Sequence, residues 1–152
     1  MHIIVDTREQ LPFTFDKYQC SIIKACLPVG DYSILGFEER IAIERKSPDD
    51  LVNCCMGADR IRFEKELAKA KAFEHFVVMI ECSYADLAQG KYRSKMQPKS
   101  VVQTITDFWI RHGVSFIFAG SRNAAEYLTF SFLEKYLYEI EKRYKTATGK
   151  AA

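Results

Sequence analysis

The chain has 152 residues, which is enough for one domain with its own core. Hydrophobic residues make up 48% of it and aromatic residues 13%, and this composition excludes a disordered chain. No apolar run approaches the length of a membrane span, no signal-peptide pattern opens the sequence, and a net charge of +2 does not by itself indicate a nucleic-acid partner.

The distribution of charge is more informative than its sum. Acidic side chains outnumber basic ones over residues 1–50, and basic side chains outnumber acidic ones over residues 51–100. This asymmetry predicts an acidic site in the first third of the chain and a surface able to bind phosphate after it.

The cysteines predict the redox environment. There are five of them, an odd number, and none forms a Cys-x-x-Cys pair. A zinc site or a disulfide framework is therefore not expected. Free thiols in an intracellular reducing compartment, either cytoplasm or nucleus, are the simplest interpretation.

The first predicted element is a short strand. The apolar run at 2–5 ends in a charged cluster that contains Asp6 and Arg8, which is typical of a buried strand whose carboxyl end enters a site. Alternatively, Asp6 and Arg8 form a surface pair at a turn. A second strand is predicted over 21–27, where Pro28 ends it.

A strand pair is predicted next. The strand-like segments 34–35 and 41–43 flank Gly36, which is a turn signal. A pair of this kind can fold back on itself and bring Asp31 close to Glu44.

Side-chain alternation sets the chemistry at the end of this pair. Glu44 and Lys46 share one face of their strand, whereas Ile41 and Ile43 share the other and can enter the core. With Asp31, the result is two carboxylates and one ammonium group. Such a cluster suits Mg²⁺ or Mn²⁺, and the lysine could orient a metal-bound water.

Helices and a central strand follow. Ser47 and Pro48 are typical of a helix start, and Asp49 and Asp50 suit its positive end. Periodicity predicts a longer helix over 59–73. The apolar run at 76–80 predicts a strand covered on both faces. Glu81, at its end, either supports a metal site or pairs with a lysine.

A basic loop spans residues 90–99. It contains Lys91, Arg93 and Lys95 together with Tyr92 and no acidic residue. It could hold a DNA backbone or stack a base, or it could be a solvated loop without a ligand.

The last third predicts helix, strand, helix. A helix capped at Ser100 is expected over 100–112, a strand over 114–118 and a final helix from 121–123 to about Tyr144. The final helix has more apolar residues than one stripe requires, which favours a partner, although aromatic residues wrapping one core would explain it too. Residues 146–152 are expected to form a loose tail.

Three ordered blocks in this sequence resemble a known family. The pattern Asp-(x)n-Glu-x-Lys at Asp31, Glu44 and Lys46 is similar to that of the PD-(D/E)XK nuclease superfamily. Gly-Asp-Tyr at 30–32, Glu-Arg-Lys-x-x-x-Asp at 44–50 and Val-Asp-x-Arg-Glu at 5–9 resemble its XPF-type branch, the structure-specific endonucleases.

The resemblance implies a fold and a reaction. The expected fold is α/β, with a mixed central β-sheet flanked by helices on both faces, restriction-endonuclease-like, over residues 1–145 and without a helix-hairpin-helix module. The expected activity is Mg²⁺- or Mn²⁺-dependent hydrolysis of DNA at branched, forked or flapped structures. Family members pair through their nuclease domains, which implies a homodimer or heterodimer through the final helix.

The resemblance also implies roles for individual residues. The metal would be held by Asp31 and Glu44, with Asp6 completing or supporting its shell. The reaction would further use Lys46, Arg8 and the backbone carbonyl of Arg45. A Gly-Arg-x-x-x-Gln-like block of the family matches Arg60 but has Asp59 and Glu64 in place of glycine and glutamine. The DNA-binding candidates are Arg60, Lys65, Lys91, Arg93 and Lys95.

Two other functions stay open. The domain could be a catalytically silent DNA-binding or scaffolding partner of a nuclease, although its three motif residues are intact. It could also be a resolvase that acts as a symmetric dimer on four-way junctions.

Overall fold

The computed structural model describes residues 1–149. One six-stranded sheet lies at its centre, in the order β2-β1-β3-β4-β5-β6. The strands are β1 (His2–Asp6), β2 (Ser21–Ala25), β3 (Tyr32–Ile34), β4 (Ile41–Lys46), β5 (His75–Ile80) and β6 (Ser115–Phe118). The helices are α1 (Pro48–Asn53), α2 (Gly57–Ala70), α3 (Tyr84–Ala88), α4 (Pro98–His112) and α5 (Arg122–Thr148).

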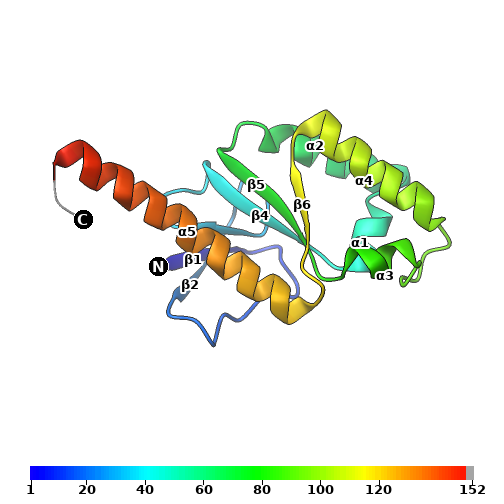
Figure 1. Ribbon diagram of the computed structural model, residues 1–152, viewed down its shortest axis with the longest axis horizontal. Helices are drawn as coiled ribbons and strands as arrows, with labels where there is room; N and C mark the ends of the chain where they lie inside the picture. The colour runs from blue at the N-terminus through cyan, green and yellow to red at the C-terminus, as the bar shows by residue number, and fades with distance from the viewer. Residues whose placement is uncertain (150–152) are drawn as a thin grey trace.

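The sheet is mixed, as the sequence predicted. β3 is antiparallel to both of its neighbours, β1 and β4, whereas β1 pairs with β2, β4 with β5 and β5 with β6 in parallel. Figure 1 shows α5 along one face of the sheet and the other helices gathered on the opposite side. Because β1 and β4 run opposite to β3, the ends of β1 and β4 meet the start of β3 at one edge.

Strand alternation divides the core into two clusters. Ile41 and Ile43 of β4 pack with β1, β3 and α5 on one face. Ala42 packs on the other face with Phe63 and Leu67 of α2. Glu44 and Lys46 therefore face α2, and Arg45 faces the side of α5. This division decides which side chains can form one site.

Several predicted boundaries were wrong. α2 ends at Ala70 rather than 73, and α4 begins at Pro98 with Gln97 as its N-cap, so Ser100 lies inside the first turn. Proline suits that first position because it has no N–H to leave unpaired. The short helix α3, which Ser83 caps, was not predicted.

The final helix is longer than predicted. α5 reaches Thr148, so residues 146–148 are helical rather than part of a loose tail, and residues 150–152 lie outside the described chain. Its last turns extend beyond the sheet (Figure 1). Much of its apolar surplus packs on the chain's own core, through Phe130, Phe132 and Ile140.

Two predictions from composition can be compared with the structure. All five cysteines are free thiols. Among residues 1–149, no helix is long and apolar enough to cross a membrane.

Candidate functional site

Three acidic residues meet at the edge where β1 and β4 end and β3 begins. Asp6, Asp31 and Glu44 all line one cavity of about 380 Å³, which α2 borders from the other side. The sequence predicted that a folded-back strand pair would bring Asp31 near Glu44, and this proximity is present. Asp6 joins them because β1 is the neighbour of β3.

Backbone contacts fix the position of Asp31. Its N–H donates to the carbonyl of Ile43 at 2.9 Å, and its carbonyl accepts from the N–H of Asp6 at 2.8 Å. Gly30 makes this approach possible: its φ is +78°, and a Cβ there would lie 3.1 Å from the Ile43 carbonyl oxygen. The Asp31 Oδ2 atom accepts from the N–H of Arg45 at 2.8 Å.

Glu44 and Lys46 form an ion pair on the same face of β4. The lysine Nζ also lies 5.1 Å from the centre of the Phe63 ring on α2. Burial lowers the pKa of Lys46, but the charge of Glu44, its hydrogen bond and the charge of Glu66 together with Cys54 outweigh that effect and raise the pKa overall. Lys46 is therefore a cation held beside Glu44, which lines the cavity.

The carboxylates of Asp31 and Glu44, which form the acidic floor of the cavity, hold their protons unusually strongly. Burial raises the pKa of Asp31 to about 7, and the nearby charge of Glu9 adds to this effect despite the hydrogen bond from Arg45. Burial, together with the charge of Asp31, also raises the pKa of Glu44 well above its usual value. Crowded carboxylates of this kind favour a cation between them.

Asp6 is braced by its neighbours. Its Oδ1 accepts from the N–H and Nε of Arg8, and its Oδ2 accepts from Arg8 Nη2 and from the N–H of Leu27 at 2.6 Å. Burial raises the pKa of Asp6, but these bonds outweigh it and leave the pKa below its usual value. Metal binding by Asp6 would have to break these bonds, so that role stays a prediction which the contacts disfavour.

The Arg45 side chain points away from the acidic floor. On the face of α5 it binds Glu9 at 3.0 Å and Glu81 at 3.2 Å. Glu81 also pairs with Arg122 of α5, whose guanidinium donates to the carbonyls of Leu11 and Pro12. Glu81 thus pairs with arginines. This network, which sequence reasoning missed, connects α5 to the strand that carries the acids.

α2 supplies side chains that the sequence did not single out. Glu66 lines the cavity, and its Oε1 lies 3.4 Å from the N–H of Gly30. Arg62 and Lys69 line it as well, together with Lys65, which was predicted. Arg62, Lys65 and Lys69 are spaced by three and four residues, which places them on one face of the helix. This spacing is the sequence signal that could have identified them.

The other predicted DNA-binding residues do not line this cavity. Arg60 points toward α4, where it contacts Asp107 at 3.4 Å and stacks on the Phe108 ring. Lys91 pairs with Asp86 and Arg93 pairs with Asp49, both at the surface. Lys95 lies in the same loop and is exposed.

The donor set fits a hard divalent ion with few protein ligands. Among residues 1–149 no three His, Cys, Asp or Glu side chains are close enough together to hold a metal. Mg²⁺ is commonly bound through one or two carboxylates, with waters and substrate phosphate completing its shell. Asp31 and Glu44 provide such a pair, and their raised pKa values have the direction expected for a cation site.

Neutralising Asp31 should stabilise the metal-free protein. Because its folded-state pKa is raised, the carboxylate costs nothing below about pH 4 and costs most above about pH 7. We expect Asp31→Asn to raise the free energy of unfolding by ~1–3 kcal/mol at pH 8, with a gain that vanishes toward pH 4. The amide oxygen can still accept from Arg45. Urea unfolding at several pH values measures this, and equal stability of both proteins at pH 8 would contradict it.

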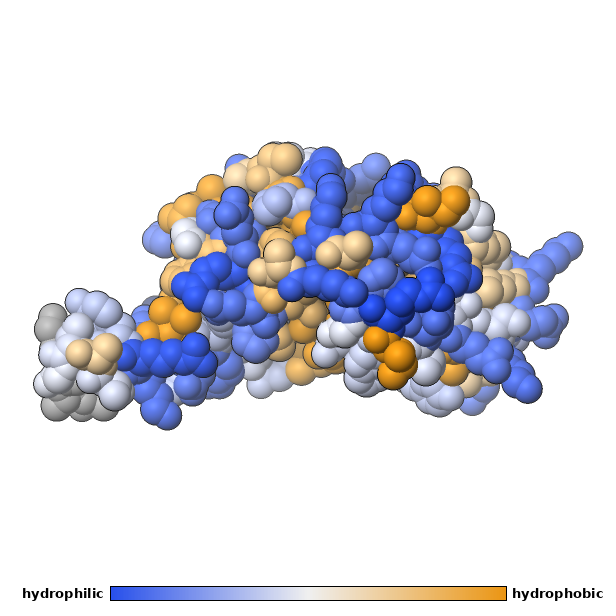
Figure 2. Space-filling view, turned by 90° about the horizontal axis from the view of Figure 1, so that it is seen from above, coloured by the Kyte–Doolittle hydropathy of each residue, from blue (hydrophilic) through white to orange (hydrophobic). Residues whose placement is uncertain are grey.

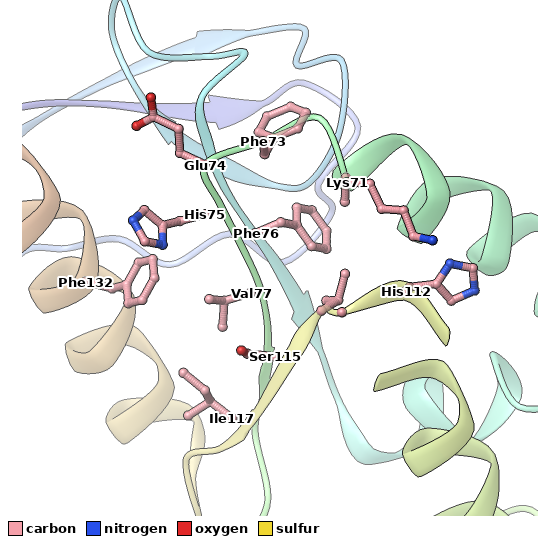
Figure 3. Close-up of a pocket in the computed structure, with 13 residues that line it drawn as sticks. Lys71, Phe73, Glu74, His75, Phe76, Val77, His112, Ser115, Ile117 and Phe132 are labelled. Carbon is pink, nitrogen blue, oxygen red and sulfur yellow. The ribbon is translucent and has the colours of Figure 1, made fainter. Parts of the chain in front are cut away.

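A second cavity lies at the opposite end of the sheet. Figure 3 shows His75 beside Phe132 of α5 on one side of it and Lys71 near His112 on the other. It measures about 350 Å³. Its one carboxylate, Glu74, is engaged by Arg40 and Tyr136. It therefore lacks the acidic pair that distinguishes the first cavity.

Comparisons with known proteins agree with this architecture. The family model of the ERCC4 domain matches residues 5–132. XPF from Aeropyrum pernix is similar in structure, with a TM-score of 0.72 and 15% identity over 95% of this chain and 69% of that one. XPF from Aeropyrum pernix in complex with DNA gives a TM-score of 0.68 and 17% identity over 91% and 66% of the two chains. No curated protein sequence matches. The predicted α/β nuclease-domain fold is thereby confirmed.

Proposed function

Because this chain belongs to the ERCC4 domain family, we propose that it is a metal-dependent DNA endonuclease. The observation that carries the proposal is the shared cavity of Asp31 and Glu44, with Lys46 paired to Glu44 beside it. The solved structure of XPF with DNA is consistent with DNA as the substrate.

Asp31 and Glu44 would hold Mg²⁺ or Mn²⁺, with the Arg45 carbonyl as a further ligand. When bound, the ion would supply a more acidic water and neutralise charge on the scissile phosphate. Lys46 would orient the attacking water and stabilise the negative charge that develops on the phosphate oxygens. Arg8, whose side chain is 66% exposed while it braces Asp6, would contact the phosphate from the other side.

Glu66 is the further carboxylate that we add to this site. It approaches Asp31 and Glu44 from α2, and its charge contributes to the raised pKa of both. Unlike Asp6, it has one hydrogen-bond donor nearby, at 3.4 Å, so its oxygens remain available. It would accept a proton from water or bind the ion through water.

The deciding experiment is a cleavage assay. Labelled forked, flapped, four-way-junction and linear DNA are incubated with the protein in Mg²⁺, Mn²⁺ or EDTA. We expect cutting of branched DNA with either ion and none in EDTA. Paired symmetric cuts in the four-way junction would instead favour a resolvase. Binding without cutting under every condition would favour a silent scaffolding partner and contradict the proposal.

A dimer through α5 belongs to the same proposal. Exposed Tyr127 and Tyr138 and the last turns of the helix beyond the sheet support it. Sedimentation of the wild type and a Tyr138→Glu variant would test it.

A further inference from the structure

Three cations of α2 border the acidic cavity, and we call Arg62, Lys65 and Lys69 the α2 stripe. They are separated by three and four residues, so they lie along one side of the helix. From Arg62 to Lys69 the stripe extends roughly 10 Å, the rise of about three nucleotides in one strand of a duplex. The face in Figure 2, seen from above the view of Figure 1, carries many hydrophilic side chains.

Two of the three stripe cations lack an acidic partner among residues 1–149, and the third, Arg62, forms an exposed ion pair within α2. Lys65 and Lys69 form no ion pair with any residue in the range 1–149, and Arg62, with an 80% exposed side chain, contacts only Asp59. By contrast, Arg60 and Arg111 are bound by acids of α2 and α4. Lys65 and Lys69 are exposed and unpaired at the rim of the cavity, so their charges are available to an external anion.

The cavity has a second basic side. Arg8, which follows β1, lines it opposite α2, and Asp31 and Glu44 lie at the floor between them. A polyanion along α2 would therefore pass over the two carboxylates with a cation on either side. The basic loop at 90–99 does not offer this arrangement, because none of its residues lines the cavity.

From this arrangement we propose that the α2 stripe binds consecutive phosphates of one DNA strand and guides that strand across the acidic floor. The inference rests on the proposed nuclease function for its choice of ligand. It assigns binding of the DNA backbone to Arg62, Lys65 and Lys69 rather than to Arg60 or the basic loop. The contacts are to phosphates, so they position the strand without reading its sequence.

The test compares two triple variants with the same loss of charge. One replaces the stripe (Arg62→Gln, Lys65→Gln, Lys69→Gln), and the other replaces the loop (Lys91→Gln, Arg93→Gln, Lys95→Gln). Glutamine keeps helix propensity, and all six side chains are exposed, so folding should persist and is checked by thermal unfolding. Both variants carry Asp31→Asn, and binding of labelled forked DNA is measured in EDTA across a range of salt concentrations.

We expect the stripe variant to bind at least about tenfold more weakly, with a salt slope of log K shallower by about 2–3. The loop variant should stay within about threefold of its parent. Equal losses in both variants, or a larger loss in the loop variant, would overturn the assignment. Because these measurements involve no cleavage, they stand apart from the nuclease assay: a protein that cuts no DNA can still show the stripe effect, and an active nuclease can lack it.

Discussion

Replacing Lys46 with alanine, or Asp31 with asparagine, is expected to lower the rate of DNA cleavage by about 1000-fold or more. Lys46 is held next to the carboxylate of Glu44 and against the Phe63 ring. Its removal takes away the charge that would face the scissile phosphate. Asp31→Asn removes one of the two carboxylates proposed to hold the ion.

The measurement is single-turnover cleavage of forked DNA, together with DNA binding in EDTA. Binding should change by less than about threefold, because the contacts to the backbone come from α2. Lys24→Ala and Asp16→Asn are matched controls, since both residues are exposed and line none of the described cavities. Cleavage at the wild-type rate by either Lys46→Ala or Asp31→Asn would contradict the proposed mechanism.

Among the substitutions considered for stability, Arg45→Met should be the most destabilising and lower the free energy of unfolding by about 3–5 kcal/mol. The Arg45 side chain is 7% exposed and its partners Glu9 and Glu81 are 5% and 11% exposed. Its removal leaves Glu9 in a poorly hydrated place without the cation that pairs with it, and leaves Glu81 with Arg122 as its ionic partner. Methionine keeps most of the volume, so the loss would come from charge rather than from a cavity.

Urea unfolding measures this effect, and Arg40→Met is the comparison. Arg40 pairs with Glu74 at the surface, where its side chain is 52% exposed, so its replacement should cost less than about 1 kcal/mol. Adding Glu9→Gln to Arg45→Met should recover part of the loss, because one unpaired charge is removed. A cost for Arg45→Met no larger than that of Arg40→Met would contradict the role of the network.

The local parts of the site could be predicted from the sequence. Glu44 and Lys46 face the same way because a strand alternates, whatever surrounds it. Asp6 and Arg8 are also close in sequence, and their contact needs only a turn. Gly36 indicated a turn, and the structure has a φ of +85° there.

The remaining contacts depend on how the elements pack. Glu9 and Glu81 each lie 36 residues from Arg45 in sequence, so no local pattern relates them. The position of Arg60 outside the cavity has a related reason. Arg60 and Lys65 are five positions apart in the helix, and at 100° per position the two side chains point in directions about 140° apart. Only the docking of α2 on the sheet decides which of them meets the cavity.

Because β3 and β4 are antiparallel, the sequence interval between Asp31 and Glu44 can vary, whereas the interval between Glu44 and Lys46 cannot. Asp31 begins one strand and Glu44 lies near the end of the other, so the connection at 35–40 is at the far end of the pair. Residues could be added to that connection without displacing either carboxylate. The interval between Glu44 and Lys46 has no such freedom, since one extra residue would turn the lysine toward α5. The connection at 35–40 can therefore change in length, whereas Glu44 and Lys46 must stay two residues apart.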